Sequence, residues 1–264
     1  MRKPVVYAHR GASGYEIENT IPSFELAVKM KADAVEFDVQ LTSDGQVVVF
    51  HDFTLARLFN SETRVAELTA GEMKQQVFKD PVDGKPVFIP LLEEVLSVIS
   101  HKIAMNIELK SDDGRQERIA ELCGKVYDLI QKYGLRDDVI VSSFNLDALR
   151  QMRGISEDVR IGVLVDRLAD DDQSVNAGDE GTLSFYIRTA RELKAAAINM
   201  SYAAVDANRI QRIHDSGFSA NIYTVNNEEL MRMLMKEGVD GFFTNYPDTA
   251  IALIEGKRVD PNPV

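Results

Sequence analysis

The feature that most constrains the fold is an alternation of short strand-like runs with longer segments of helical periodicity along almost the whole chain. We predict strands at Val5–His9, Ala34–Leu41, Val47–His51, Ile103–Lys110, Val139–Ser142, Arg160–Val165, Ala197–Met200, Ala220–Val225 and Gly241–Thr244. We predict helices at Ile21–Met30, Leu92–Ser100, Arg115–Tyr133, Leu146–Gly154, Thr182–Lys194, Asp206–Ser216, Asn227–Lys236 and Pro247–Glu255. Strands that alternate with helices over about 250 residues are typical of a parallel α/β protein, and the pattern favours a (β/α)₈ TIM barrel.

A doubly wound sheet is the alternative architecture, but no Gly-x-Gly-x-x-Gly sequence follows the first predicted strand, which disfavours it. No Gly/Ser linker or low-complexity tract divides the chain, so we expect residues 1–264 to form a single domain. The stretch from Phe53 to Phe88 is long and polar, which indicates a functional loop or a small insertion. Asp166–Gly181 is rich in acidic residues and is interpreted as a solvated loop, because it lacks the ligand spacing of a calcium-binding loop.

The composition excludes several classes of protein. The chain has 30 Lys and Arg against 42 Asp and Glu, a formal charge of −12, and this acidic surface disfavours binding to nucleic acid or to anionic lipid. No apolar run is long enough to span a bilayer, and the charged start of the chain does not resemble a signal peptide. The single cysteine, Cys123, fits a reducing compartment. We therefore expect a cytoplasmic protein without a stable membrane anchor.

Polar side chains alternate with apolar ones on two of the predicted strands. In Ala34–Leu41 the apolar residues share one face, while Glu36 and Asp38 share the other. In Ile103–Lys110 the same alternation places Glu108 and Lys110 opposite the apolar face. Because the outer face of a barrel packs against helices, we expect these charged residues to point into the interior.

The polar residues at strand ends are expected to converge. Active sites of (β/α)₈ barrels lie at the carboxyl ends of the strands. The residues placed there by the pattern are His9, Glu36, Asp38, His51, Glu108 and Lys110, and Arg10 directly follows His9 as a further cationic group. Neighbouring buried carboxylates repel one another unless a cation lies among them, and oxygen ligands favour Mg²⁺ or Ca²⁺. A divalent cation, two further cationic groups and paired histidines together indicate metal-assisted cleavage of a phosphodiester.

Each of these residues also has a structural interpretation. Glu36 and Asp38 could form a solvated strand face, either histidine could be structural, and Lys110 could simply pair with Glu108. Arg10 could be a surface residue before a loop. The Asn-Thr pair at positions 19 and 20 is interpreted as the cap of the following helix. Glu18 is left outside the predicted metal site, although it could hydrogen-bond within the site loop.

Ordered motifs along the chain resemble those of the glycerophosphodiester phosphodiesterase family. They are His9-Arg10-Gly11, Glu18-Asn19-Thr20, Glu36-Phe37-Asp38-Val39, His51-Asp52, the segment Ile89–Leu96, Asn106-Ile107-Glu108-Leu109-Lys110, Ser142-Ser143-Phe144, Tyr223-Thr224-Val225-Asn226, Gly238-Val239-Asp240-Gly241 and Thr244-Asn245-Tyr246-Pro247. The resemblance covers almost the whole chain. Position 91 is Leu where the family usually has Thr, and position 223 is Tyr where Trp is common.

The resemblance implies an eight-stranded barrel with residues 53–88 as a small insertion after the second strand, over the glycerol end of the site. It implies one divalent metal, Mg²⁺ or Ca²⁺, held by Glu36, Asp38 and Glu108. It implies His9 and His51 as general acid and base, with Arg10 and Lys110 holding the phosphate. The implied reaction, in lipid and glycerol metabolism, hydrolyses glycerophosphodiesters to glycerol 3-phosphate and an alcohol, through a cyclic phosphate.

Two other functions remain open at this point. One is a lysophospholipase D or phosphoinositide phospholipase activity on lipid substrates, which would require an exposed apolar rim. Apolar residues of the insertion that could supply it are Leu55, Leu58, Phe59, Val77 and Phe78, although a wrapped mini-core is the preferred interpretation. The other is a non-catalytic glycerophosphate-binding module. The preferred alcohol, the metal, the assignment of acid and base, and the choice between monomer and homodimer are not encoded in any pattern that we recognise.

Overall fold

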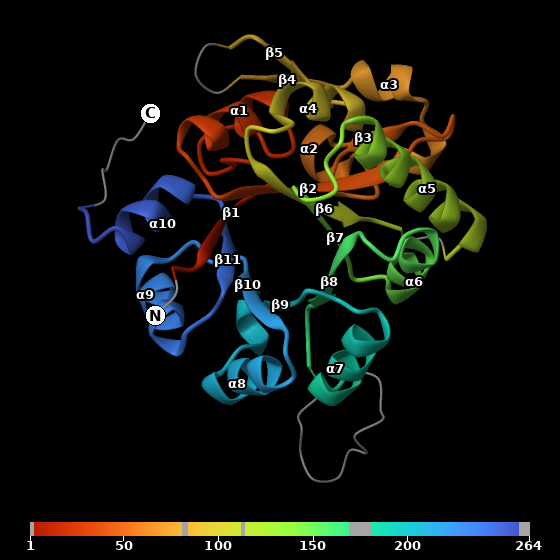
Figure 1. The fold of residues 1–264 in the computed structure, drawn as a ribbon. Helices are drawn as coiled ribbons and strands as arrows, with labels where there is room; N and C mark the ends of the chain where they lie inside the picture. The colour runs from red at the N-terminus through yellow and green to blue at the C-terminus, as the bar shows by residue number, and fades with distance from the viewer. Residues whose placement is uncertain (1–2, 81–83, 112–113, 169–180, 259–264) are drawn as a thin grey trace.

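The computed structural model describes residues 3–80, 84–111, 114–168 and 181–258. Its centre is a closed barrel of parallel strands (Figure 1). The barrel strands are β1 (Val5–His9), β2 (Ala34–Leu41), β6 (Ala104–Leu109), β7 (Val139–Ser143), β8 (Arg160–Val165), β9 (Ala197–Ser201), β10 (Ser219–Tyr223) and β11 (Gly241–Thr244). Pairing of β1 with both β11 and β2 closes the ring. The predicted TIM barrel is therefore confirmed.

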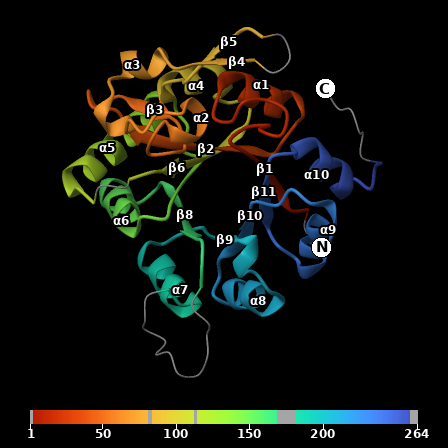
Figure 2. The ribbon, with the colours of Figure 1, turned by 180° about the vertical axis from the view of Figure 1, so that it is seen from behind.

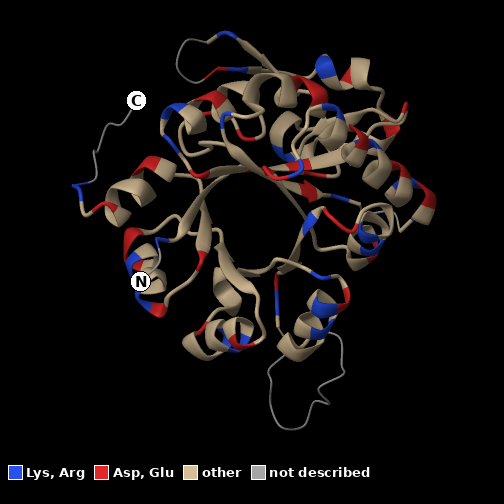
Figure 3. Cartoon of the chain, in the orientation of Figure 1, with Lys and Arg blue, Asp and Glu red and all other residues tan. Residues whose placement is uncertain are grey.

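Helices surround the strands on the outside, as the view from behind also shows (Figure 2). They are α1 (Ile21–Lys29), α4 (Leu92–Ile99), α5 (Gln116–Lys132), α6 (Leu146–Ile155), α7 (Leu183–Glu192), α8 (Ala207–Asp215), α9 (Glu228–Glu237) and α10 (Pro247–Ile254). Lys, Arg, Asp and Glu are interspersed around this outer ring (Figure 3). Within the part of the chain that the structure describes, no helix has the length and apolarity needed to cross a membrane.

The two faces of β2 explain how carboxylates come to lie inside the barrel. Val35, Phe37 and Val39 are fully buried in the core cluster between the strands and the outer helices. The Phe37 ring lies 5.3 Å from that of Phe24 on α1. Burying this apolar face contributes about 25 cal/mol for each Å² removed from water. Because successive side chains point to opposite sides of a strand, this packing turns Glu36 and Asp38 inward.

One predicted strand has a different role from the one expected. The run from Val47 shortens to β3 (Val47–Val49), which pairs antiparallel with β2 and is not a strand of the barrel. His51 therefore does not follow a parallel barrel strand. The chain reverses after β2, so the start of β3 lies beside the carboxyl end of β2. Because β3 then runs back along β2, His51 reaches the same end of the barrel as the other site residues.

The insertion consists of short elements that lie together beside β2 (Figure 1). After β3 they are α2 (Ala56–Phe59), a 3-10 turn (Val65–Glu67), α3 (Ala70–Lys74), β4 (Val77–Lys79) and β5 (Pro86–Phe88). The insertion has its own core of Val48, Phe50, Leu55, Val65, Met73 and Ile89, against which Leu58, Phe59, Leu68, Phe78 and Leu91 pack. Val77, by contrast, is 44% exposed. The predicted mini-core is present, with Val77 outside it.

Met73 tests the contribution of this mini-core, because it is fully buried and lies away from the barrel interior. We expect Met73→Ala to lower the free energy of unfolding by about 2–5 kcal/mol through lost burial and a residual cavity. Urea denaturation followed by circular dichroism measures the change. A loss below about 0.5 kcal/mol, the level of ordinary surface substitutions, would mean that the insertion packs too loosely to count as a core.

Most of the predicted acidic loop, residues 169–180, lies outside the described residues.

Candidate active site

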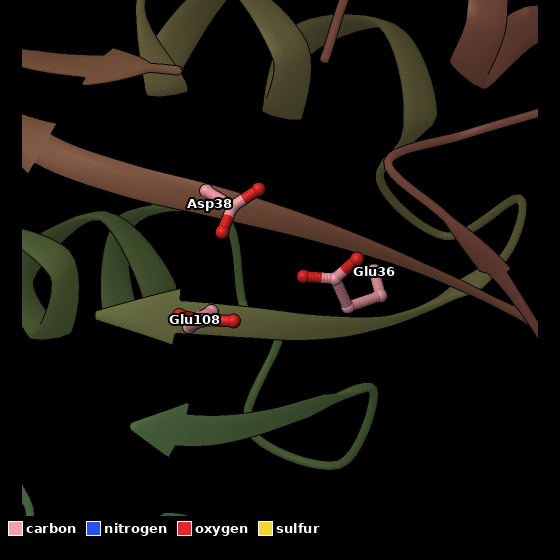
Figure 4. A group of neighbouring side chains, drawn as sticks. All are labelled: Glu36, Asp38 and Glu108. Carbon is pink, nitrogen blue, oxygen red and sulfur yellow. The ribbon is translucent and has the colours of Figure 1, made fainter. Parts of the chain in front are cut away.

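Three carboxylates meet inside the barrel at the carboxyl ends of neighbouring strands (Figure 4). Glu36 and Asp38 come from β2 and Glu108 comes from β6, where Glu108 is the register partner of Asp38. One oxygen from each of the three lies within 4.8 Å of the others. Strand pairing thus brings together residues 70 positions apart, as the alternation pattern predicts.

The surroundings of the three carboxyl groups shift their pKa values in different directions. Burial, followed by repulsion from Asp38 and Glu108, raises the pKa of Glu36 well above its ordinary value. Burial, followed by Asp38, raises the pKa of Glu108 to about 7. Burial would also raise the pKa of Asp38, but Arg10 and Lys110 outweigh it and lower that pKa to about 2. Asp38 is thus the carboxylate that stays ionised, beside two that resist ionisation.

This donor set fits a divalent cation. It is buried, consists of carboxylate oxygens alone, and carries repulsion that a bound cation would relieve. Asp38 Oδ1 is buried and accepts no hydrogen bond from any residue that the structure describes, although Lys110 Nζ lies 3.5 Å away. An unsatisfied buried carboxylate oxygen is costly, which indicates a ligand at this position.

Two cationic side chains flank the carboxylates. Arg10 Nε lies 3.3 Å from Asp38 Oδ2, and Lys110 Nζ lies 3.1 Å from Glu108 Oε1. Arg10 Nε is buried and donates no hydrogen bond to a residue within the described ranges. Lys110 Nζ also lies 5.5 Å from the ring centre of Phe53, the residue at the start of the predicted insertion. These two groups can neutralise an anion that enters an otherwise acidic site.

The loop after β1 is shaped by a tight turn. Arg10 has a φ of 55° and Gly11 a φ of 83°, both in the left-handed region. A Cβ on Gly11 would lie 2.7 Å from the carbonyl carbon of Ser23, so only glycine fits between the turn and α1. The Arg10 N–H donates to Glu36 Oε2 at 3.0 Å, which fixes the loop to the carboxylate cluster.

His9 is half-buried at the end of β1 with a defined ring orientation. Its Nδ1 lies 2.8 Å from Asn245 Oδ1, so Nδ1 carries the proton and Nε2 is left with its lone pair, 3.9 Å from Glu36 Oε2. Burial, followed by the charge of Arg10, lowers the pKa of His9 to about 4. The imidazole is therefore neutral near pH 7.

His51 forms a second oriented imidazole in the turn after β3. Its Nδ1 lies 2.6 Å from Asp52 Oδ1, which leaves Nε2 available for the reaction. Burial lowers the pKa of His51, whereas Asp38 and the hydrogen bond to Asp52 raise it in part. A carboxylate beside an imidazole fixes the tautomer and stabilises the imidazolium when a proton arrives.

A cavity of about 200 Å³ joins these groups, and its lining includes both histidines, Arg10, Glu36 and Glu108. Its other side is aromatic: Tyr223 stacks edge-on with Phe144 at 5.9 Å and with Phe243 at 6.3 Å. Lys110 lies under the adjoining hollow with His51 and Phe53. The cavity is large enough for a small phosphoester and presents acid–base groups on one side and an apolar surface on the other.

The structure brings all the residues that were predicted for the site together, and adds others. The predicted residues are His9, Arg10, Glu36, Asp38, His51, Glu108 and Lys110. Asn19 is not a helix cap: its Nδ2 donates to Asp38 Oδ2 at 2.9 Å, while Thr20 is the N-cap residue. Glu18 bonds within the site loop, as considered above, by accepting from Arg10 at 3.0 Å. Asn245 and Asp52, which orient the histidines, belong to the sequence motifs, but the sequence pattern assigns them no role of their own.

The raised pKa of Glu108 predicts that metal binding depends on pH. Glu108 must be deprotonated to bind a cation, and its pKa of about 7 means that a proton competes below that pH. We expect the dissociation constant for Mg²⁺ or Ca²⁺ to increase at least about tenfold for each pH unit below 7, because Glu36, whose pKa is also raised, adds a second competing proton. Calorimetric titrations at pH 8 and pH 6 measure it, and equal affinities at both values would contradict the assignment.

Comparison with known proteins also relates the chain to phosphodiesterases. The profile of the glycerophosphoryl diester phosphodiesterase family matches residues 9–249. A glycerophosphodiester phosphodiesterase of Bacillus subtilis (strain 168) is 34% identical over 256 residues, covering 91% of this chain and 83% of that protein. One from Caldanaerobacter subterraneus is 33% identical over 257 residues, covering 96% and 98%.

A solved structure extends the match to three dimensions. It is that of an Oleispira antarctica phosphodiesterase in complex with the product sn-glycerol-3-phosphate. The two chains are 26% identical, align with a TM-score of 0.80, and are covered to 96% and 97%. The motifs, the barrel, the cavity and these matches agree, and the chain belongs to the glycerophosphoryl diester phosphodiesterase family.

Proposed function

We propose that this chain is a glycerophosphodiesterase that hydrolyses glycerophosphodiesters to glycerol 3-phosphate and an alcohol. The observation that carries the proposal is the convergence of two oriented histidines, two cations and three carboxylates on one cavity. Family membership supports the same reaction class. The whole of residues 1–264 would act as a single domain, in which the segment 53–88 covers one side of the site.

The residues divide into three roles. Glu36, Asp38 and Glu108 would hold one divalent cation, Mg²⁺ or Ca²⁺. When bound, such a cation polarises a phosphoryl oxygen and offsets the negative charge that develops on it. Arg10 and Lys110 would bind the remaining phosphate oxygens, and their charges would stabilise the transition state in a site shielded from water.

The histidines would move the protons. One neutral imidazole accepts the proton of the attacking hydroxyl at Nε2, and the other, which starts as the imidazolium, donates its Nε2 proton to the departing alkoxide. We propose that the glycerol hydroxyl next to the ester attacks first, forms a cyclic phosphate and releases the alcohol. Water then opens the ring with the two imidazoles in exchanged roles: the one now neutral takes a proton from water, and the one now protonated returns a proton to the ring oxygen that leaves. An attacking group within the substrate avoids the entropy loss of capturing a second molecule. His51, paired with Asp52, is the better placed of the two to hold positive charge during this exchange.

A panel of glycerophosphodiesters tests the proposal. Choline, ethanolamine, glycerol and inositol esters are incubated with the protein and Mg²⁺ or Ca²⁺, and released glycerol 3-phosphate is measured. We expect turnover of at least one ester. An analogue that lacks the adjacent hydroxyl should not be cleaved if a cyclic phosphate forms, and cleavage of that analogue at the rate of the parent ester would exclude this intermediate.

Exposed apolar residues on the insertion favour a second candidate, action on lysophospholipids. Val77 and Phe88 are register partners on β4 and β5 and are 44% and 50% exposed. Such a pair could contact a lipid chain. Adding lysophosphatidylcholine to the same panel discriminates the candidates: faster release of choline from the lipid than from its deacylated form would favour the lipid substrate.

A further inference from the structure

Arg57 joins two carboxylates that orient different parts of the candidate active site. It lies on α2 of the insertion, outside the set of residues predicted for the chemistry. Its Nε donates to Asp52 Oδ2 at 2.6 Å. Its two terminal nitrogens donate to the two oxygens of Glu18, at 2.9 and 2.5 Å. All three nitrogens of one guanidinium are therefore engaged with carboxylates.

Each of these carboxylates contacts a group of the proposed machinery. The second oxygen of Asp52, Oδ1, lies 2.6 Å from Nδ1 of His51. Glu18 Oε1 also accepts from Arg10 NH1 at 3.0 Å. A continuous chain of contacts thus runs from the imidazole in the turn after β3, through Arg57, to the guanidinium in the loop after β1.

The backbone of Arg57 is held firmly enough to act in this way. Leu55, directly before α2, is buried in the mini-core of the insertion. The ring of Phe59, at the end of α2, lies 6.4 Å from that of Phe50 and 4.4 Å from that of Phe78. Apolar anchors on both sides fix the position from which the guanidinium reaches the two carboxylates.

On this basis, and on that of the proposed function, we infer that Arg57 is a positioning residue: its guanidinium fork holds Asp52 against His51 and Glu18 against Arg10. It connects the insertion to the barrel and sets the geometry of the proton-transfer group and the phosphate-binding group together. All three of its nitrogens donate to the two carboxylates, and its proposed effect on the reaction passes through them.

The geometry distinguishes this network from ordinary surface ion pairs. The side chain of Arg57 is 45% exposed, but its partners Glu18 and Asp52 are only 19% and 20% exposed. Arg150, by comparison, is 51% exposed and pairs with Asp147, which is equally exposed, three residues away on α6. Exposed pairs of the second kind contribute little, whereas a planar fork that bridges two carboxylates fixes direction as well as charge.

Loss of the fork should disturb both ends of the network. Without Arg57, the ionised Asp52 and Glu18 repel each other. Asp52 then keeps its contact with His51 but loses the guanidinium, and Glu18 keeps its contact with Arg10 alone. A catalytic group displaced by about 1 Å can lower a rate about 10²-fold. We therefore expect Arg57→Ala to reduce kcat by roughly 10- to 100-fold, with a much smaller change in KM.

The test compares Arg57→Ala and Arg57→Lys with wild type and with Arg150→Ala as the matched control. Lysine keeps the charge but cannot engage both carboxylates as a fork, so Arg57→Lys should also lower kcat. Arg150→Ala should leave kcat and KM unchanged. Thermal melts confirm that each variant is folded, and Arg57→Lys serves if the alanine variant is not. Millimolar guanidinium chloride should restore part of the activity of Arg57→Ala, whereas equal sodium chloride should not.

A double-mutant cycle tests whether Arg57 affects kcat through Asp52. If Arg57 acts through Asp52, Arg57→Ala should lower kcat much less in the Asp52→Asn background than in wild type. Fully additive losses, a wild-type kcat in either folded Arg57 variant, or a rise in KM alone would overturn the inference. Wild-type protein without turnover on any ester would instead remove the proposed function, so the two failures are distinct.

Discussion

We expect His51→Ala to lower kcat for glycerophosphodiester hydrolysis by about 10²–10⁴-fold, the range typical of a lost general acid or base. The reason is the orientation of this imidazole: Asp52 fixes Nδ1, so Nε2 is the nitrogen to which we assign proton exchange at the cavity. Alanine leaves the carboxylate cluster intact. We therefore expect metal binding to persist while turnover is lost.

His101→Ala is the matched control for this prediction. The side chain of His101 is 62% exposed and lies far from the cavity lining, beside Asp138. Its loss should leave kcat and KM unchanged. A folded His51→Ala variant that retains more than about a tenth of wild-type kcat would contradict a role in proton transfer, because that loss falls below the range expected for such a group.

Glu36→Gln should abolish both the response to divalent metal and the activity. Glutamine fills nearly the same volume but replaces a charged oxygen ligand by an amide. In the wild type, a metal at 100 times its dissociation constant stabilises the fold by about 2.7 kcal/mol, which corresponds to a rise in Tm of roughly 5 °C for a chain of this size. The variant should show no such rise.

Without metal, the same variant should be at least as stable as wild type. The raised pKa of Glu36 means that the folded state holds this proton more tightly than the unfolded chain does. Its contribution to stability is therefore lost as pH rises above the unfolded value of about 4.3, and a neutral glutamine avoids that loss.

Thermal melts at pH 8, with chelator and with added Mg²⁺ or Ca²⁺, measure both effects of Glu36→Gln. Glu121→Gln is the control, because Glu121 is 42% exposed and pairs with Lys125 on α5. It should melt like wild type with and without metal. An undiminished metal response in Glu36→Gln would contradict its assignment as a ligand.

The fold could be predicted from the sequence almost completely, because its signal is local. Alternation along Ala34–Leu41 records which side chains pack on helices and which face the interior, and the structure shows every residue of that strand buried. The direction of Val47–Val49 could not be predicted, since an apolar run has the same composition in a parallel and an antiparallel pair.

The site could be predicted where carboxylates alternate with apolar residues on a predicted strand, as for Glu36, Asp38 and Glu108. It was not predictable where the role depends on distant contacts. Asn19 lies before a helix and is a plausible cap by sequence, but its φ of 58° turns the amide toward Asp38 instead. Arg57 contacts Glu18, which is 39 positions away, and no local pattern reports that pairing.

The most direct test of the account is the release of glycerol 3-phosphate by purified wild-type protein under three conditions: Mg²⁺, Ca²⁺ and chelator. We expect turnover with at least one metal, loss of turnover with chelator, recovery on adding metal back, and no recovery of turnover in His51→Ala. Folded wild-type protein that releases no glycerol 3-phosphate from any ester with either metal would contradict it, as would turnover that chelator leaves unchanged.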